Sequence, residues 1–407
     1  MMKKSVLVVL SGFFLFGLGF ENTSQAEVKL SCLDKVPGVT IKGIGDASLT
    51  INYLMQFYGQ WRDTGSGASG TKSTSDFYFR RNRLSLTGQA TKTLGYALTY
   101  EHIGDRTILP LEVSAQPATN LSVLDAFAVV DLSEGFKVTV GRTKVPFVRE
   151  IQEKCFSQIS VDRSLFVNTA SKGTRDMGLL FWGNLLSKKV QYKFAIMDGH
   201  ESTVGPVTPS SSFRYTARAH LALLDPEDGY NYSGTYLGDK IVLTIGGGAQ
   251  FEADAVFAGG ATDSKDYTAY TGDVFLEFPL GTTGTVTASG AYLLTDYDDA
   301  YLGSSPDPES TGIAGQKDGW YAKAAYLHRS NIGPGQIQPF VRYEQWNFAS
   351  LDGVTDQKID WIAGGLNYLI NGEAARVSLE YANTDFETET ATVEDFMTIT
   401  TMLQLAF

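Results

Sequence analysis

Charged residues are scarce in this chain: they make up 19% of its 407 residues, below the usual quarter. Acidic residues outnumber basic ones, and a net charge of −12 is unsuited to nucleic-acid binding. The two cysteines, Cys32 and Cys155, are too few for a disulfide framework, and no C-x-x-C spacing suggests zinc or haem. The sequence alone does not indicate a bonding partner for Cys155. The four histidines are scattered, so we expect no metal site. We also expect no cofactor and, given the net charge, no nucleic-acid partner.

Long apolar runs are missing too, except at the N-terminus. Lys3 and Lys4 precede an apolar run over residues 6–20, and a polar stretch ends at Ala26, which is typical of a cleaved secretory signal. About 15 apolar residues are fewer than the roughly 20 that a membrane-spanning helix needs. We expect residues 1–26 to be a signal peptide, 27–46 a short N-terminal periplasmic segment, and 47–407 one domain.

Glycine and aromatic residues are abundant, with 42 Gly, 24 Phe and 20 Tyr. Apolar and polar residues alternate over long stretches, for example residues 49–61, 213–221 and 397–407, and this period of two indicates β-strands. Strands of a soluble sandwich usually have about five or six residues, whereas a membrane-spanning strand needs about 9 to 11. The length of the alternation therefore favours a wall that is apolar outside and hydrated inside.

Continued along the chain, the alternation predicts about sixteen strands, as in bacterial outer-membrane barrels. They are expected at 47–61, 77–90, 95–103, 122–132, 136–144, 175–183, 190–198, 213–222, 240–252, 267–278, 285–295, 320–328, 337–348, 359–370, 375–383 and 396–407. Short turns and longer Gly/Ser/Asp-rich connections alternate between them, which predicts a closed antiparallel barrel with both ends in the periplasm. The connection 223–239 is an exception, because it is long where a short turn is expected.

Several segments resemble the phosphate-selective porin O and P family of outer-membrane barrels. They are FRRNRLSLTGQATKTLGYALTYE from Phe79, TVGRTKVPFVRE from Thr139, VDRSL from Val161, YSGTYLG from Tyr232, QPFVRYE from Gln338 and GLNYLINGEAARVSLEY from Gly365. The resemblance implies a sixteen-stranded, usually trimeric channel with a narrow eyelet lined by arginine and lysine that selects anions. It also implies that the third outward loop folds into the lumen and narrows it.

The period of two predicts which cations point into the lumen. Arg80 falls on the outward face by this count, and Arg142 would need a bulge to turn inward. The pore-lining or anion-binding candidates are Arg81, Arg83, Arg149, Arg163, Arg214, Arg218, Lys323 and Arg342. Acids face the lumen as well, so pairing between neighbouring strands is the alternative role for many of these residues.

The segment from Lys144 to Lys172 is the expected third loop, because connections of this length commonly bind or gate. Its remaining charged candidates are Lys144, Glu150, Lys154 and Asp162. Cations at a narrow passage select anions, since a low-dielectric constriction focuses their field. Arg149 and Arg163 are expected either to contact permeating ions or to pin the loop to the wall.

These observations predict a passive outer-membrane porin for small hydrophilic solutes, with the anion preference that the resemblance implies. We expect outer-membrane lipid and lipopolysaccharide, a homotrimer, and small inorganic anions as partners. A non-selective or cation-leaning general porin is one alternative, favoured by the acidic net charge. A structural barrel that encloses or presents a partner protein is another. No serine, histidine and carboxylate arrangement is recognisable, so we expect no enzyme.

Overall fold

The computed structural model describes residues 33, 36, 38–63, 73–102, 121–165, 174–200, 209, 212–258, 263–301, 315–351, 353–390 and 394–407. The expected signal peptide and residues 166–172 of the expected third loop lie outside these ranges. No helix within them is long and apolar enough to cross a membrane.

The chain forms strands almost throughout. Their bounds are β1 Val39–Lys42, β2 Ser48–Asp63, β3 Ser73–Gln89, β4 Leu94–His102, β5 Leu121–Ser133, β6 Phe136–Lys144, β7 Arg175–Leu185, β8 Val190–Met197, β9 Arg214–Ala222, β10 Val242–Phe257, β11 Ser264–Pro279, β12 Gly284–Asp296, β13 Gln316–His328, β14 Gln336–Leu351, β15 Val354–Asn371, β16 Ala375–Phe386 and β17 Phe396–Ala406. The short helix α1 spans Arg149–Gln152, and the 3-10 helix η1 spans Asp298–Tyr301.

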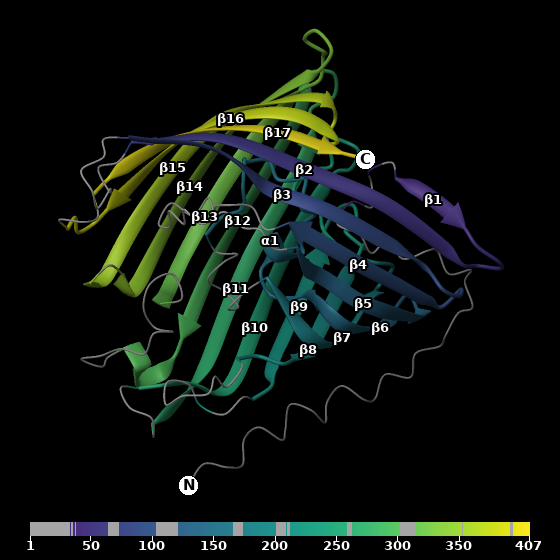
Figure 1. Cartoon of the computed structure of the whole chain (residues 1–407), viewed down its shortest axis with the longest axis horizontal. Helices are drawn as coiled ribbons and strands as arrows, with labels where there is room; N and C mark the ends of the chain where they lie inside the picture. Colours follow the sequence, from purple (N-terminus) through teal and green to yellow (C-terminus); the bar gives the residue numbers. More distant parts are fainter. Residues whose placement is uncertain are drawn as a thin grey trace.

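Strands β2 to β17 close a barrel (Figure 1). Each pairs antiparallel with its neighbours in sequence, and β17 pairs with β2, so the described residues form a ring of sixteen strands. Closure satisfies the backbone groups of every strand, as a hydrocarbon environment requires. The expected sixteen-stranded antiparallel barrel is confirmed. An additional short strand, β1, comes from the segment 27–46 and pairs with Ser48–Ile51 of β2.

The observed strand ends agree with the predicted ones for some strands and differ for others. Strand β6 has the bounds that the sequence predicts, Phe136–Lys144. Strands β14 and β15 reach Leu351 and Val354, further than the predicted limits at 348 and 359. Antiparallel pairing continues beyond these limits, where Phe348, Ala349 and Leu351 are all buried. Apolar residues then no longer alternate, so the sequence underestimates these strands.

The two faces of the wall differ as the period of two predicts. On β9, Tyr215 and Leu221 are 41% and 43% exposed on the outer face, whereas Arg214 and Arg218 are 1% and 3% exposed on the inner face. The inner face is not wholly polar, however. Trp182 of β7 belongs to an apolar cluster within the barrel, so part of the lumen is filled rather than hydrated.

Candidate functional site

The constriction loop, residues 145–165, follows β6 and lies inside the barrel. Every residue from Val145 to Leu165 is buried, and α1 near the start of the loop stands within the ring of strands (Figure 1). A connection on the molecular surface would expose most of its residues. The expectation that the third loop folds into the lumen is therefore confirmed.

Polar side chains of the wall hold the constriction loop by its backbone. Tyr58 donates to the carbonyl of Val161 at 2.8 Å, Asn367 to Ile159 at 2.8 Å, Arg376 to Gln158 at 2.6 Å and Gln404 to Phe156 at 3.0 Å. The donors come from β2, β15, β16 and β17. A loop buried in a lumen cannot leave its carbonyls without donors, and here the barrel supplies them.

The long turn, residues 223–241 between β9 and β10, rises into the lumen from the opposite end and meets the constriction loop. The amide of Lys154 donates to the carbonyl of Tyr232 at 2.9 Å, and the amide of Tyr232 donates to Gln152 at 3.0 Å. The amide of Gly234 donates to the hydroxyl of Ser157 at 2.9 Å. This is the connection that is too long for an ordinary turn, and its extra length is used to brace the loop.

Arg149 is the main charged link between the two segments. Its guanidinium donates to both carboxylate oxygens of Glu227 in the long turn, at 2.8 and 2.7 Å, and lies 4.0 Å from the centre of the Phe275 ring. Its side chain is fully buried. Of the two roles that the sequence leaves open for Arg149, this geometry supports the pin.

The other candidates on the wall are also paired with acids. Arg214 binds Glu252 at 2.7 Å, Arg218 binds Asp273 at 2.6 Å, Arg342 binds Glu344 at 2.9 Å, and Lys323 binds Glu150 of the constriction loop. Lys144 donates to the carbonyl of Glu153 and to the side chain of Asn231, both at 2.7 Å. Lys154, the other basic candidate of the constriction loop, is also buried. These groups hold segments of the barrel together.

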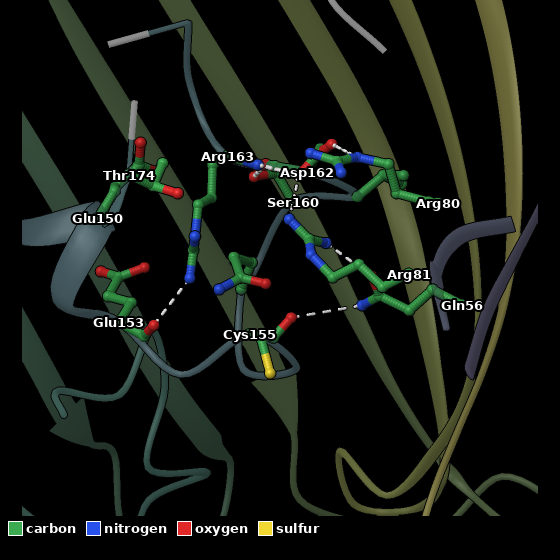
Figure 2. A network of polar contacts seen from close by, with 12 residues as sticks. Gln56, Arg80, Arg81, Glu150, Glu153, Cys155, Ser160, Asp162, Arg163 and Thr174 are labelled. Atoms are coloured by element: carbon green, nitrogen blue, oxygen red, sulfur yellow. Dashed lines mark hydrogen bonds and ion pairs between the residues drawn. The ribbon is translucent and has the colours of Figure 1, made fainter. Parts of the chain in front are cut away.

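A second set of cations, here called the arginine cluster, comprises Arg80, Arg81, Arg83, Arg163 and Arg175. Figure 2 shows Arg80, Arg81 and Arg163 with Asp162. Arg80 and Arg81 share the carboxylate of Asp162 at 2.5 and 2.8 Å. Arg83 binds Glu101 at 2.6 Å, and Arg175 binds Asp125 at 3.0 Å. Five guanidinium groups thus share three carboxylates in the described residues.

Arg80 enters the cluster through a β-bulge. Gln56 of β2 pairs with Arg81 of β3, but the next residue, Phe57, pairs with Phe79. Arg80 is therefore the extra residue of the bulge, which re-aims its side chain toward Asp162. Simple counting of alternate residues places Arg80 on the outer face, and this prediction is wrong because the bulge changes the register.

Arg163 is the member of the cluster without a carboxylate partner in the described part of the chain. One nitrogen donates to the carbonyl of Glu153 at 2.8 Å, and Nε has no hydrogen-bond partner. Buried nitrogens of Arg83 and Arg175 also lack partners. An unsatisfied buried donor is costly, so these nitrogens are available as donors to water or to a solute in the lumen.

Burial and the close approach of the guanidinium groups both affect the ionisation of the cluster. Burial and the neighbouring guanidinium groups of Arg81, Arg175 and Arg83 lower the pKa of Arg163 to about 9. Burial alone would raise the pKa of Asp162, but Arg80 and Arg81 outweigh it and hold that pKa well below its usual range. The cluster thus keeps its carboxylate ionised at neutral pH and still carries surplus positive charge.

The residual exposure at the arginine cluster is small and is shared by both signs of charge. Arg163 and Arg175 are 9% and 7% exposed and Asp162 and Asp125 are 7% each, whereas Glu150, Glu153 and Glu344 are 0% exposed. A solute at the cluster therefore meets more guanidinium groups than carboxylates, while the three glutamates of the opposite side are covered.

Cys155 of the constriction loop is disulfide-bonded. The sequence contains one other cysteine, Cys32, which lies outside the described residues and is the sole intrachain partner available. Cys155 packs in a buried apolar cluster with Leu33, Val36, Leu54 and Phe156. Two cysteines are too few for a framework, but we expect one bond between Cys32 and Cys155.

Sequence reasoning missed Arg80, Arg175 and Glu227. The bulge at Arg80 leaves no mark in the alternation, Arg175 is the first residue of its strand, and Glu227 lies in a connection of no recognisable motif. The one available signal was the unexpected length of the long turn. No group of three or more His, Cys, Asp or Glu in the described residues could hold a metal ion.

A closed antiparallel barrel with an apolar outer face and a lumen narrowed by its own loop defines a porin of the bacterial outer membrane. The chain belongs to the phosphate-selective porin O and P family, whose profile matches residues 55–201 and 217–407. An uncharacterized protein of Aquifex aeolicus (strain VF5) is 25% identical over 325 residues, which cover 74% of each chain.

Solved porins share the fold at low identity. The anion-selective porin from Comamonas acidovorans has a TM-score of 0.55 at 12% identity, covering 89% of this chain and all of that one. The outer membrane channel DcaP of Acinetobacter baumannii has a TM-score of 0.58 at 13% identity, with 90% and 99% covered. These likenesses establish the architecture, and the chemistry of the constriction must be argued from this chain.

Proposed function

We propose that this porin prefers anions and that the arginine cluster is its selective element. The observation that carries the proposal is Arg163, a buried cation beside other arginines, without a carboxylate partner in the described residues and with residual access to the lumen. Guanidinium groups match oxyanions with charge-assisted hydrogen bonds. Phosphate or another small inorganic oxyanion is therefore the proposed solute, in keeping with the description of the family.

The acidic net charge does not oppose this proposal, because many of the acids lie away from the arginine cluster. Asp263 and Asp356, with side chains 61% and 71% exposed, stand near the outward ends of their strands, where water and salt screen them. Charges at a narrow, low-dielectric passage act on a permeating ion far more strongly. The sign of selectivity should follow the constriction and not the whole chain.

The alternative of a barrel that encloses a partner protein has little support. The constriction loop and the long turn fill part of the lumen and bind one another there. A threaded partner would have to displace both. We further propose that residues 1–26 direct export and are removed, and that lipid and lipopolysaccharide surround the barrel.

The expected result for Arg163→Ala is a weaker block of chloride current by phosphate. A hydrogen bond to a charged group contributes about 1.5–3 kcal/mol, so the phosphate concentration for half block should rise by about tenfold or more. The measurement is single-channel recording in planar bilayers with added phosphate, together with the reversal potential across a KCl gradient.

Two variants control this test. Arg163→Lys keeps the charge and should retain part of the block. The double variant Arg214→Gln with Glu252→Gln removes a paired lumen charge together with its partner and should leave the block unchanged. A cation-selective reversal potential for the wild-type protein, or an unaltered block in Arg163→Ala, would contradict the proposal.

The link between Arg149 and Glu227 should persist in mild acid. Burial acts to raise the pKa of Glu227, but Arg149 outweighs it and lowers that pKa to about 2. A carboxyl group whose pKa is lower in the folded state stabilises that state. This stabilisation is fully present above the unfolded pKa of about 4.3 and is lost only as the pH falls toward 2. Wild-type conductance should therefore stay low from pH 8 to about pH 4, whereas Glu227→Gln should conduct more at every pH. A wild-type conductance that rises to the level of the variant by pH 5 would contradict this.

A further inference from the structure

The segment that precedes the barrel lies partly inside the lumen. Leu33 and Val36 are 0% and 7% exposed, and they pack with Leu54 of β2 and Ala406 of β17. Leu54 and Ala406 pair with one another on the inner face of the wall, and Ala406 is the last residue of its strand. The segment is therefore inside the periplasmic mouth of the barrel, the end at which short turns join the strands.

Strand β1 fixes the point at which the segment leaves the lumen. The pairing of β17 with β2 ends beside Tyr53, whose amide donates to the carbonyl of Phe407 at 2.7 Å. Strand β1 takes the same edge of β2 beyond this point, with Val39 opposite Ile51 (Figure 1). The segment thus passes from the mouth of the barrel directly onto the wall, in the place where β17 ends.

Gly38 lies at the step from the lumen to the wall. A Cβ at this position would lie 2.3 Å from Nδ2 of Asn52 and 2.7 Å from the carbonyl oxygen of Ile51. The side-chain amide of Asn52 occupies this space and donates to the carbonyl of Val36 at 3.3 Å. Glycine permits such a close approach because it has no Cβ. The local sequence is therefore suited to holding Val36 inside the mouth.

The wall provides an apolar seat for the segment. Along the inner face of β2, Leu54 stands between the polar residues Asn52 and Gln56. It is nevertheless 0% exposed, and the side chains of its apolar cluster include Leu33 and Val36. Without them an apolar side chain would face the water of the pore, which is unfavourable. The match between this seat and two apolar residues ahead of the barrel indicates a specific contact.

The segment also meets the constriction loop, directly behind the arginine cluster. Cys155 of the loop belongs to the same apolar cluster as Leu33 and Val36. The carbonyl of Cys155 accepts from Gln56 at 3.5 Å, and Gln56 in turn accepts from Arg81 at 2.6 Å. Figure 2 shows these contacts, with the sulfur of Cys155 turned away from the arginines. The segment therefore borders the way from the arginine cluster to the periplasm.

We propose that Leu33, Val36 and Gly38, here called the inner plug, form a fixed periplasmic constriction that limits the size of the solutes that leave the pore. The arginine cluster acts on charge, whereas the inner plug acts on size alone, because its side chains carry no charge. The disulfide that we expect between Cys32 and Cys155 fastens the residue before Leu33 to the constriction loop. The proposal rests on the protein being a porin and is independent of its ion preference.

The test uses uncharged sugars of increasing size, whose passage does not depend on ion preference. The swelling rate of liposomes that contain the purified full-length porin reports the size limit, and planar bilayers report the conductance. Leu33→Ala with Val36→Ala should raise the swelling rate for large sugars several-fold relative to that for small ones, because the seat is no longer filled. Gly38→Val should do so independently, since its side chain displaces Asn52 and expels the segment. Both variants should also conduct more than the wild-type protein.

Two controls remove or add the same atoms elsewhere. Val39→Ala with Ile41→Ala removes as many carbon atoms from β1, where these residues are 63% and 53% exposed. Gly272→Val adds the same side chain to β11 at a position where a Cβ meets no atom within 4 Å. Both should keep the wild-type size limit and conductance. Heat-modifiable migration in denaturing gels and circular dichroism would show that each barrel is folded.

An unchanged size limit in both plug variants would overturn the proposal, and so would an equal change in the controls. The reversal potential across a KCl gradient should keep its wild-type sign in the plug variants, because the arginine cluster is intact. A reversal potential that collapses toward zero together with the size limit would place the effect in the constriction loop and would also overturn the proposal. The anion preference is read from the wild-type reversal potential, so it can fail while the inner plug holds.

Discussion

Replacing Pro226–Lys240 by Asn-Gly is expected to raise the single-channel conductance several-fold. Asp225 and Ile241 already face each other at the base of the long turn, with the amide of Asp225 donating to the carbonyl of Ile241 at 2.9 Å. An Asn-Gly turn can join such a pair, so the barrel should still close. The lumen would lose Glu227, Tyr230 and Tyr232, which are buried against the constriction loop.

The mechanism of the increase has two parts. Removal of the long turn empties part of the lumen, and it also leaves Arg149 without Glu227, so the loop loses its charged pin. A buried charge that has lost its partner is strongly destabilising, and α1 should move toward solvent. Conductance and its fluctuations in planar bilayers would report both effects.

A matched control is the turn between β13 and β14. Its residues 331–334 are exposed, and replacing them by Asn-Gly should leave the conductance unchanged. If the Pro226–Lys240 replacement folds and conducts like the wild-type protein, the long turn does not narrow the pore.

Cys155→Ser is expected to lower the free energy of unfolding by about 5 kcal/mol, the chain-entropy value for a closed loop of roughly 120 residues. Reduction of the wild-type protein should have the same effect. The constriction loop would also lose its covalent link, while Gln404 and Tyr58 would still hold its carbonyls. We therefore expect a noisier channel and a lower thermal midpoint in detergent.

The pairing itself can be tested with a double variant. Cys32→Ser with Cys155→Ser should be no less stable than either single variant, because each removes the same bond. Stability losses that add, or a free thiol in the unfolded, unreduced wild-type protein, would show that the two cysteines are not joined.

The barrel could be predicted because its signal is local. Each strand must present apolar residues to lipid and polar ones to the lumen, and the alternation in residues 213–221 records this without reference to any other segment. The range of β6 follows in the same way. The constriction loop is anticipated by its length and by resemblance to the family.

The arginine cluster could be predicted only in part. Arg81, Arg83 and Arg163 are inferred from parity and loop position, but Arg175 and the bulge at Arg80 are not, since a bulge depends on the register with β2. The roles of the predicted cations could not be separated either. Arg149 and Arg163 lie in the same loop, yet one is bound by Glu227 and the other lacks a carboxylate in the described residues.

The sequence by itself determined the architecture, because apolar and polar residues alternate along each strand. This alternation makes one face compatible with lipid and the other hydrated. Only the tertiary structure decided what fills the lumen. Glu227 meets Arg149, and Asp162 meets Arg80 and Arg81, across 78 to 82 positions of the chain. Which cations remain for a solute depends on these distant pairings, and charge neutralisation across a closed barrel leaves no periodic pattern in the sequence.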